Sequence, residues 1–178
     1  MAAVDADATR LIVSIVGPES SGKTTLAERL AMTFGAPGLA EYAREYLTGR
    51  PNYTENDLDT IARGQQAQEH ALLEAGHPLV VLDTDLIVIR VWWQEKYGYV
   101  PDWVDQHLRE QRERVYLLTC PDLPWEPDPL RESPADRDRL FEIYRVTLDQ
   151  YGFSYSEIRG TGEPRYELGL AAVRRASS

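Results

Sequence analysis

Short apolar runs and longer amphipathic stretches alternate along the chain. Runs rich in branched apolar residues at 11–16, 79–83 and 114–119 have the length and composition of strands buried on both faces of a parallel sheet. The segment 153–158 alternates apolar and polar residues like a further strand. The spacing of apolar positions predicts helices at 23–31, at about 54–76, after 85 and through 97, at 136–151, and at 165–175. This alternation predicts a three-layer α/β/α fold with a mainly parallel sheet.

The long helix after residue 54 carries its own start and stop signals. Thr54 followed by Asp57 has the spacing of a capping-box variant and places an acid in the first turn. Gly76 and then Pro78 make a plausible stop. The region 35–47, which precedes this helix, predicts only a short element that ends in Glu41–Leu47.

Composition limits the class of protein. The 178 residues suit a single domain, expected at 10–175, with residues 1–9 as a disordered lead-in. A formal net charge of −10 argues against nucleic acid as a partner, since strands of nucleic acid repel an acidic surface. The single cysteine, Cys120, rules out an intrachain disulfide framework, so a reducing cytoplasm is the natural setting. We expect no membrane association, because no apolar run approaches the length of a span.

The most specific motif follows the first predicted strand. Gly17-Pro18-Glu19-Ser20-Ser21-Gly22-Lys23-Thr24 matches the phosphate-loop pattern G-x-x-x-x-G-K-[ST], with a buried strand before it and a helix after it. Glycines let the backbone curl around an anion, and the amide groups and the helix N-terminus then face the phosphates. A chance match in a glycine- and serine-rich turn is the alternative, but the strand and helix on either side argue against it.

This loop predicts ATP and Mg²⁺ as cofactors. We expect Lys23 to reach the β- and γ-phosphates and Thr24 to place its hydroxyl on the metal. The residues predicted to bind the nucleotide are Gly17, Glu19, Ser20, Ser21, Gly22, Lys23, Thr24 and Thr25.

Three acids are further candidates. Asp83 ends an apolar strand, where P-loop enzymes place an acid that helps to hold Mg²⁺, and Asp85 could reach the same pocket. Either residue could instead cap the next helix. Glu41 falls at the edge where ligands of such sheets gather, and its carboxylate could accept the proton of an attacking hydroxyl. A solvated glutamate at a helix start is the alternative for Glu41.

The region 121–134 is rich in proline, tryptophan and charge and predicts a loop. Such a loop could close over the phosphates and bring an arginine to the transferred group, for which Arg131 is the candidate. An ordinary surface loop with internal salt bridges is the alternative. Arg137 and Arg139, on the next predicted helix, could simply face water.

Aromatic side chains are dense for a chain of this size. Tyr42, Tyr46 and Trp92 are candidates to stack a flat, cationic ring, although any single aromatic residue more commonly belongs to the core. Gln65 could read a polar base or amide. The three histidines lack partners at metal-ligand spacing.

Five segments together resemble the ribosylnicotinamide kinase domain of NadR-type proteins. They are the phosphate loop 17–25, Glu41-Tyr42-Ala43-Arg44-Glu45-Tyr46, Ile61-Ala62-Arg63-Gly64-Gln65, Asp83-Thr84-Asp85, and Pro124-Trp125 with 128–131. The resemblance extends from about residue 10 to about residue 172. It implies a nucleoside-monophosphate-kinase-like fold with a mobile lid at 121–134, in which Pro129 stands where a flexible glycine is expected.

The resemblance also implies an activity, the transfer of the ATP γ-phosphate to the 5′-hydroxyl of nicotinamide riboside. The acceptor pocket would then be lined by the segments 41–46 and 83–85, Arg44 included. Lys23, Glu41, Asp83 and Arg131 are the predicted catalytic residues, with the choice of base between Glu41 and Asp83 left open. A kinase for another nucleoside or nucleotide and a regulatory P-loop ATPase or switch are the alternatives. The sequence leaves open whether the chain forms a homo-oligomer.

Overall fold

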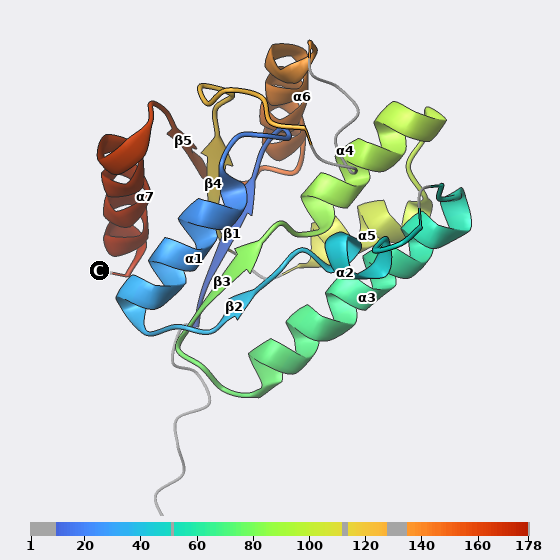
Figure 1. Cartoon of the computed structure of the whole chain (residues 1–178). Helices are drawn as coiled ribbons and strands as arrows, with labels where there is room; N and C mark the ends of the chain where they lie inside the picture. The colour runs from blue at the N-terminus through green and yellow to red at the C-terminus, as the bar shows by residue number, and fades with distance from the viewer. Residues whose placement is uncertain (1–9, 51, 112–113, 128–134, 178) are drawn as a thin grey trace, which may run out of the picture.

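The computed structural model describes residues 10–50, 52–111, 114–127 and 135–177. Its strands are β1 (Leu11–Val16), β2 (Gly38–Leu39), β3 (Leu79–Asp83), β4 (Val115–Thr119) and β5 (Tyr155–Ile158). Its helices are α1 (Lys23–Phe34), α2 (Tyr42–Tyr46), α3 (Glu55–Glu74), α4 (Leu86–Tyr97), α5 (Asp102–Glu110), α6 (Arg137–Gln150) and α7 (Gly162–Ala176). Figure 1 shows these elements along the chain.

All five strands pair in parallel, in the order β2-β3-β1-β4-β5. In the register, Ile15 of β1 faces Asp83 of β3 on one side and Leu117 of β4 on the other. The carboxyl ends of the three central strands therefore meet at one edge of the sheet, where ligands of such folds bind. The predicted α/β/α architecture is confirmed.

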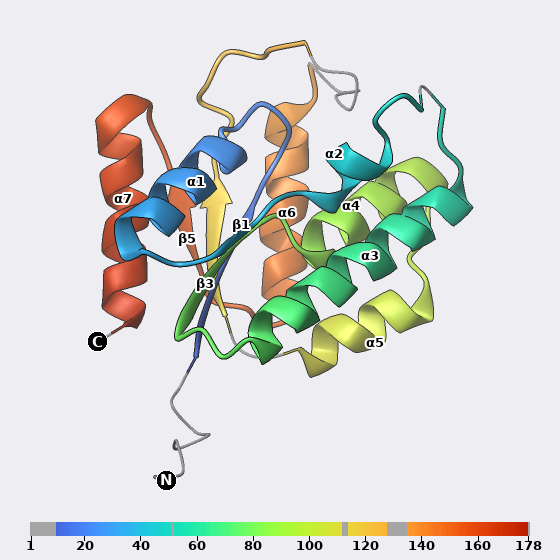
Figure 2. The ribbon, with the colours of Figure 1, turned by 60° about the horizontal axis from the view of Figure 1, so that its bottom comes forward.

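Helices cover both faces of the sheet, as Figure 2 shows. Side chains alternate along β1, so Val13 and Ile15 pack with α1 and α7, whereas Val16 packs with the cluster formed by α3, α4, α5 and α6. Ser14 points to this second face and is fully buried, although it is polar. Burial on both faces explains why β1 reads as an almost continuous apolar run.

Most predicted elements lie where the sequence placed them. The capping box at the start of α3 is present: the Asp57 amide donates to the Thr54 hydroxyl, and the Asp57 carboxylate accepts from the Thr54 amide. Two elements were not predicted. The two-residue β2 is too short to show a pattern, but α5 had a signal in Pro101 and in Asp102 of its first turn. Within the described residues, no helix combines the length and the apolar character needed to cross a membrane.

Candidate active site

The phosphate loop has a backbone that other residues would strain. Gly17 has φ 140°, and a Cβ there would lie 2.5 Å from the Thr119 hydroxyl oxygen. Gly22 begins α1 in the left-handed region, with φ 76°, and a Cβ there would lie 2.7 Å from Leu123. Both glycines are therefore required by the geometry of the loop and by its close neighbours.

Hydrogen bonds hold the loop in this curled shape. The Ser21 hydroxyl donates to the Pro18 carbonyl at 2.6 Å and shares a hydrogen bond of 2.6 Å with the Thr119 hydroxyl on β4. From the opposite side, the Arg165 guanidinium of α7 donates to the carbonyls of Ser21 and Cys120. A loop fixed in this way needs little reordering when an anion binds.

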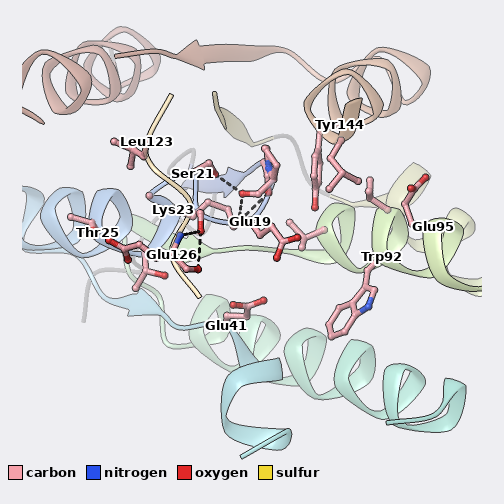
Figure 3. A pocket seen from close by; sticks show the side chains of 18 of the residues that line it. Glu19, Ser21, Lys23, Thr25, Glu41, Trp92, Glu95, Leu123, Glu126 and Tyr144 are labelled. Carbon is pink, nitrogen blue, oxygen red and sulfur yellow. Dashed lines mark hydrogen bonds between the residues drawn. The ribbon is translucent and has the colours of Figure 1, made fainter. Parts of the chain in front are cut away.

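The Lys23 ammonium lies inside the curl of the loop. Its Nζ donates to the carbonyl oxygens of Gly17 and Pro18 at 3.0 and 2.9 Å (Figure 3). Phosphate oxygens in the same hollow would compete for these donors, and a charge-assisted bond to phosphate is the stronger partner.

Thr24 and Asp83 meet across the edge of the sheet, as their predicted role at a metal requires. The Thr24 hydroxyl donates to Asp83 Oδ2 at 2.6 Å, and Asp83 is only 4% exposed. The other carboxylate oxygen, Oδ1, is buried and has no hydrogen-bond partner among the described residues. A buried oxygen without a donor beside a hydroxyl suits a hard cation such as Mg²⁺, so these two residues fit the ion. That they hold it stays a prediction.

The buried position also changes the acidity of Asp83. Loss of solvation raises the pKa of this carboxyl above its ordinary value of 3.8, against the opposing effects of the Thr24 hydrogen bond and the Lys23 charge. An acid whose pKa is raised by folding stabilises the protein while it is protonated, and this contribution is lost as the pH rises through the raised pKa. The ionised form therefore costs stability at neutral pH.

We expect Asp83→Asn to raise the free energy of unfolding at pH 7, because the amide keeps the hydrogen bond to Thr24 but carries no buried charge. The gain should shrink as the pH falls and should vanish below pH 3.8, where the wild-type carboxyl is protonated in both the folded and the unfolded state. Chemical denaturation of both proteins across this pH range measures the difference. A gain that stays constant with pH would contradict the assignment of the cost to this ionisation.

The phosphate loop opens into a cavity of about 600 Å³. Beyond the loop, the lining comes from α2, α4, α6 and the segment before residue 127: Glu41, Arg44, Val88, Val91, Trp92, Glu95, Lys96, Leu123, Pro124, Glu126, Arg139, Leu140 and Tyr144. Figure 3 shows Trp92 and Tyr144 on the side of the cavity away from α1, and Glu41 between Lys23 and Trp92. One continuous hollow therefore joins a phosphate site to a partly aromatic compartment.

Glu41 stands at the entrance to this compartment as the N-cap residue of α2. Its side chain is 18% exposed and forms an ion pair with Arg44 at 3.1 Å. Both residues line the cavity, and their contact with an acceptor stays a prediction.

Tyr53 fixes the orientation of the Trp92 side chain. Its indole N–H donates to the Tyr53 hydroxyl at 2.7 Å, and the two rings pack edge to face at 5.1 Å. Tyr144 on α6 also lines the cavity and was not predicted, because on the buried face of an amphipathic helix a tyrosine reads as core. Burial and the nearby carboxylates, Glu41 among them, raise the pKa of Tyr144, so the phenol stays neutral.

The segment 121–127 crosses above the phosphate loop. The Glu126 amide donates to the Ser20 hydroxyl at 3.1 Å, and Arg137 donates to the carbonyls of Ser20 and Leu123. Arg139 also lines the cavity, where it pairs with Glu95, and its side chain is half exposed. The predicted lid arginine, Arg131, and Pro129 lie outside the described residues.

Four predicted substrate-binding residues are absent from the cavity lining: Tyr42, Tyr46, Gln65 and Asp85. Gln65 is buried and accepts from the Tyr42 amide at 2.9 Å, while the Tyr46 hydroxyl donates to Asp57 at 2.9 Å. Asp85 is fully buried and points away from the site toward Arg114. Gln65 and Tyr46 thus fasten α2 to α3, which positions Glu41 indirectly.

The parallel sheet, the phosphate loop and the acid at the end of the neighbouring strand define a P-loop protein with the architecture of small-molecule kinases. Residues 12–165 match the AAA domain family AAA_28, and the chain belongs to this family.

Comparisons with known proteins confirm the resemblance to NadR. The chain is 29% identical over 153 residues to the trifunctional NAD biosynthesis/regulator protein NadR of Escherichia coli K12, covering 82% of this chain and 37% of that protein. It is 29% identical over 132 residues to the NadR of Salmonella typhimurium, covering 71% of this chain and 32% of that protein. The chain therefore spans about a third of the length of these curated relatives.

Solved structures agree with this relationship. A NadR protein in complex with NR superposes with a TM-score of 0.73 at 25% identity, and one in complex with NAD and AMP-PNP with a TM-score of 0.72 at 26% identity. Each match covers 94% of this chain and 49% of the other. A deoxyadenosine kinase with bound dATP, at 12% identity and a TM-score of 0.59, covering 95% of this chain and 100% of that one, shares the fold.

Proposed function

We propose that this chain is an ATP- and Mg²⁺-dependent kinase that phosphorylates the 5′-hydroxyl of nicotinamide riboside to give nicotinamide mononucleotide. The observation that carries the proposal is the continuity of the cavity. Phosphate-loop residues and the compartment around Glu41, Trp92 and Tyr144 line the same hollow, which suits a donor and an acceptor bound together. The similarity to a NadR protein solved with AMP-PNP supports a nucleotide as the donor, and the similarity to one solved with NR supports nicotinamide riboside as the acceptor.

The chemistry of the acceptor compartment suits a cationic ring better than a neutral base. Trp92 and Tyr144 offer aromatic surfaces, and the carboxylates of Glu41 and Glu95 line the same space. A pyridinium ring gains from the aromatic faces through cation–π attraction, whereas the carboxylates already have cationic partners, Glu41 in Arg44 and Glu95 in Arg139. The cation–π attraction is the feature that favours nicotinamide riboside over adenosine, cytidine or their relatives.

In the proposed reaction the acceptor hydroxyl oxygen attacks the γ-phosphorus, and the bond from that phosphorus to the β–γ bridging oxygen breaks to release ADP. Glu41 takes the hydroxyl proton, since its carboxylate lines the cavity, whereas Asp83 is buried behind it and bonded to Thr24. Lys23 holds the β- and γ-phosphates in line with the acceptor. When bound at Thr24 and Asp83, Mg²⁺ supplies further neutralisation of the phosphate charge.

Positioning and charge neutralisation carry most of the rate in such a reaction. Arg137 donates to the Leu123 carbonyl of the segment that crosses the loop, and Arg139 lines the cavity. Arg131 is the proposed lid arginine, because it lies in the charged, proline-rich loop 121–134 and because the resemblance implies a lid there.

A substrate panel tests the proposal directly. Purified protein with Mg²⁺-ATP and either nicotinamide riboside, adenosine, cytidine, guanosine or uridine is scored for monophosphate product by mass. We expect nicotinamide mononucleotide to form with kcat/KM at least about tenfold above that for any neutral nucleoside, the equivalent of one favourable cation–π contact.

Two other outcomes would contradict the proposal. Preference for a neutral nucleoside would assign the chain to a different kinase activity. ATP hydrolysis that needs an added protein and ignores every nucleoside would instead favour a regulatory switch.

A further inference from the structure

A buried ionic network lies beneath the sheet edge that carries Asp83. Arg114, just before β4, is 8% exposed, Asp85 is fully buried, and Glu69 on α3 is 6% exposed. The Arg114 guanidinium donates to Glu69 Oε1 at 2.9 Å and to Asp85 Oδ2 at 3.3 Å. It also donates to the buried Ser14 hydroxyl of β1 at 3.4 Å. None of these residues lines the cavity.

Both oxygens of the Asp85 carboxylate accept hydrogen bonds from structural partners. Its Oδ1 accepts from the Ile87 amide at 3.0 Å and so caps α4. Its Oδ2 accepts from the Tyr116 hydroxyl at 2.8 Å as well as from Arg114. Burial alone would lower the pKa of Arg114, but the charges of Asp85 and Glu69 raise it, so the guanidinium stays charged.

The residue between Asp83 and Asp85 adopts an unfavourable backbone conformation. Thr84 has φ 71°, a region that β-branched residues rarely occupy. On either side of this turn the two acids face different partners: Asp83 contacts Thr24, and Asp85 contacts Arg114. The Thr84 amide donates to the Ile15 carbonyl at 3.1 Å. Strained residues of this kind persist where the surroundings hold them.

We infer that Asp85, clamped by Arg114 and Tyr116, is a positioning residue that holds the strained Thr84 turn and thereby keeps the Asp83 carboxylate against Thr24. The inference rests on the nucleotide site of the proposed function, and it assigns Asp85 a role other than the predicted contact with the acceptor. The same carboxylate caps the N-terminus of α4, the helix that carries Trp92. Asp85 therefore positions both Asp83, the predicted Mg²⁺ ligand, and the helix that lines the acceptor compartment.

Asp85→Asn is the direct test, since the amide keeps the cap on Ile87 but loses the charge that faces Arg114. Glu69→Gln is the matched control: it removes the same charge from the other side of Arg114, yet Glu69 is on α3 and is not joined to the turn. The affinity for AMP-PNP is measured by calorimetry, first with excess EDTA and then with increasing Mg²⁺. The free Mg²⁺ concentration that gives half of the increase in affinity is then compared between the variants and the wild type.

We expect Asp85→Asn to raise the half-saturating Mg²⁺ about tenfold while leaving binding in EDTA within twofold of the wild type. Glu69→Gln should lower the melting temperature but leave the Mg²⁺ dependence unchanged. A merely structural role would lower the folded fraction without moving the Mg²⁺ constant of the molecules that remain folded. Equal shifts in both variants, or no shift in Asp85→Asn, would overturn the inference.

A second pair of variants keeps the inference open to disproof if Asp85→Asn folds poorly. Arg114→Lys keeps the cation but loses the planar fork that reaches both acids, and we expect the same direction of change. Adding Thr84→Gly to Asp85→Asn should recover most of the Mg²⁺ dependence, because glycine adopts this turn without strain. No recovery would overturn the claim that the clamp acts through the turn. Wild-type protein without Mg²⁺-dependent binding would instead contradict the proposed function itself.

Discussion

Replacement of Lys23 by alanine is expected to lower kcat for nicotinamide riboside by about 10³-fold or more, the scale on which phosphoryl transfer depends on a single cation at the transferred group. The ammonium lies within the curl of the phosphate loop, at 3.0 and 2.9 Å from the carbonyls of Gly17 and Pro18. A triphosphate in that hollow would draw it to the β- and γ-oxygens, and alanine leaves their charge without this partner. Initial-rate assays at saturating ATP and acceptor measure the loss.

Arg29→Ala serves as the matched control for this variant. Arg29 is a cation on the same helix, but it pairs with the exposed Glu163 on α7 and lies outside the cavity. Surface pairs of this kind contribute about 1 kcal/mol at most, so both the fold and the turnover should persist. Near-normal turnover in Lys23→Ala, with the control intact, would contradict phosphate binding by the loop.

Replacement of Glu41 by glutamine is expected to lower kcat by about 10²-fold or more, the usual contribution of a general base, with KM for ATP nearly unchanged. The amide keeps the shape of the side chain but cannot accept the hydroxyl proton. It also weakens the pairing with Arg44 at 3.1 Å, so we expect a smaller rise in KM for the acceptor. Steady-state kinetics with each substrate varied separately distinguishes the two effects.

Glu45→Gln is the control here, because Glu45 is exposed on the same short helix and does not line the cavity. It should retain kcat within about twofold, as surface substitutions usually do. If Glu41→Gln behaves like Glu45→Gln, the proton acceptor is another group, and Asp83, the other carboxylate considered, becomes the candidate.

Local patterns were sufficient to predict where the phosphate loop lies in the fold. The phosphate loop lies within one turn and the start of one helix, so its residues are brought together by the motif itself. The acid at the end of β3 was also predictable, because the carboxyl ends of neighbouring parallel strands meet at one edge. The structure brings Thr24 and Asp83 to 2.6 Å from positions 59 residues apart.

The acceptor side shows where such reasoning stops. Asp83 and Asp85 are two residues apart and were both expected at the same pocket, but the left-handed turn at Thr84 sends their side chains in opposite directions. Likewise, Trp92 and Trp93 are adjacent on α4, yet Trp92 lines the cavity while Trp93 is buried in the core. Tyr144 enters the compartment from α6, whose packing no local pattern describes.

The sequence by itself determined the layered α/β class, the parallel strands and the phosphate loop of this protein, because periodic burial and a contiguous motif are properties of neighbouring residues. The tertiary structure alone decided which acids face the cavity and which face Arg114, and which aromatic rings enclose the acceptor compartment. Those outcomes depend on how α2, α4 and α6 pack over the sheet edge, and packing brings together residues that the sequence separates.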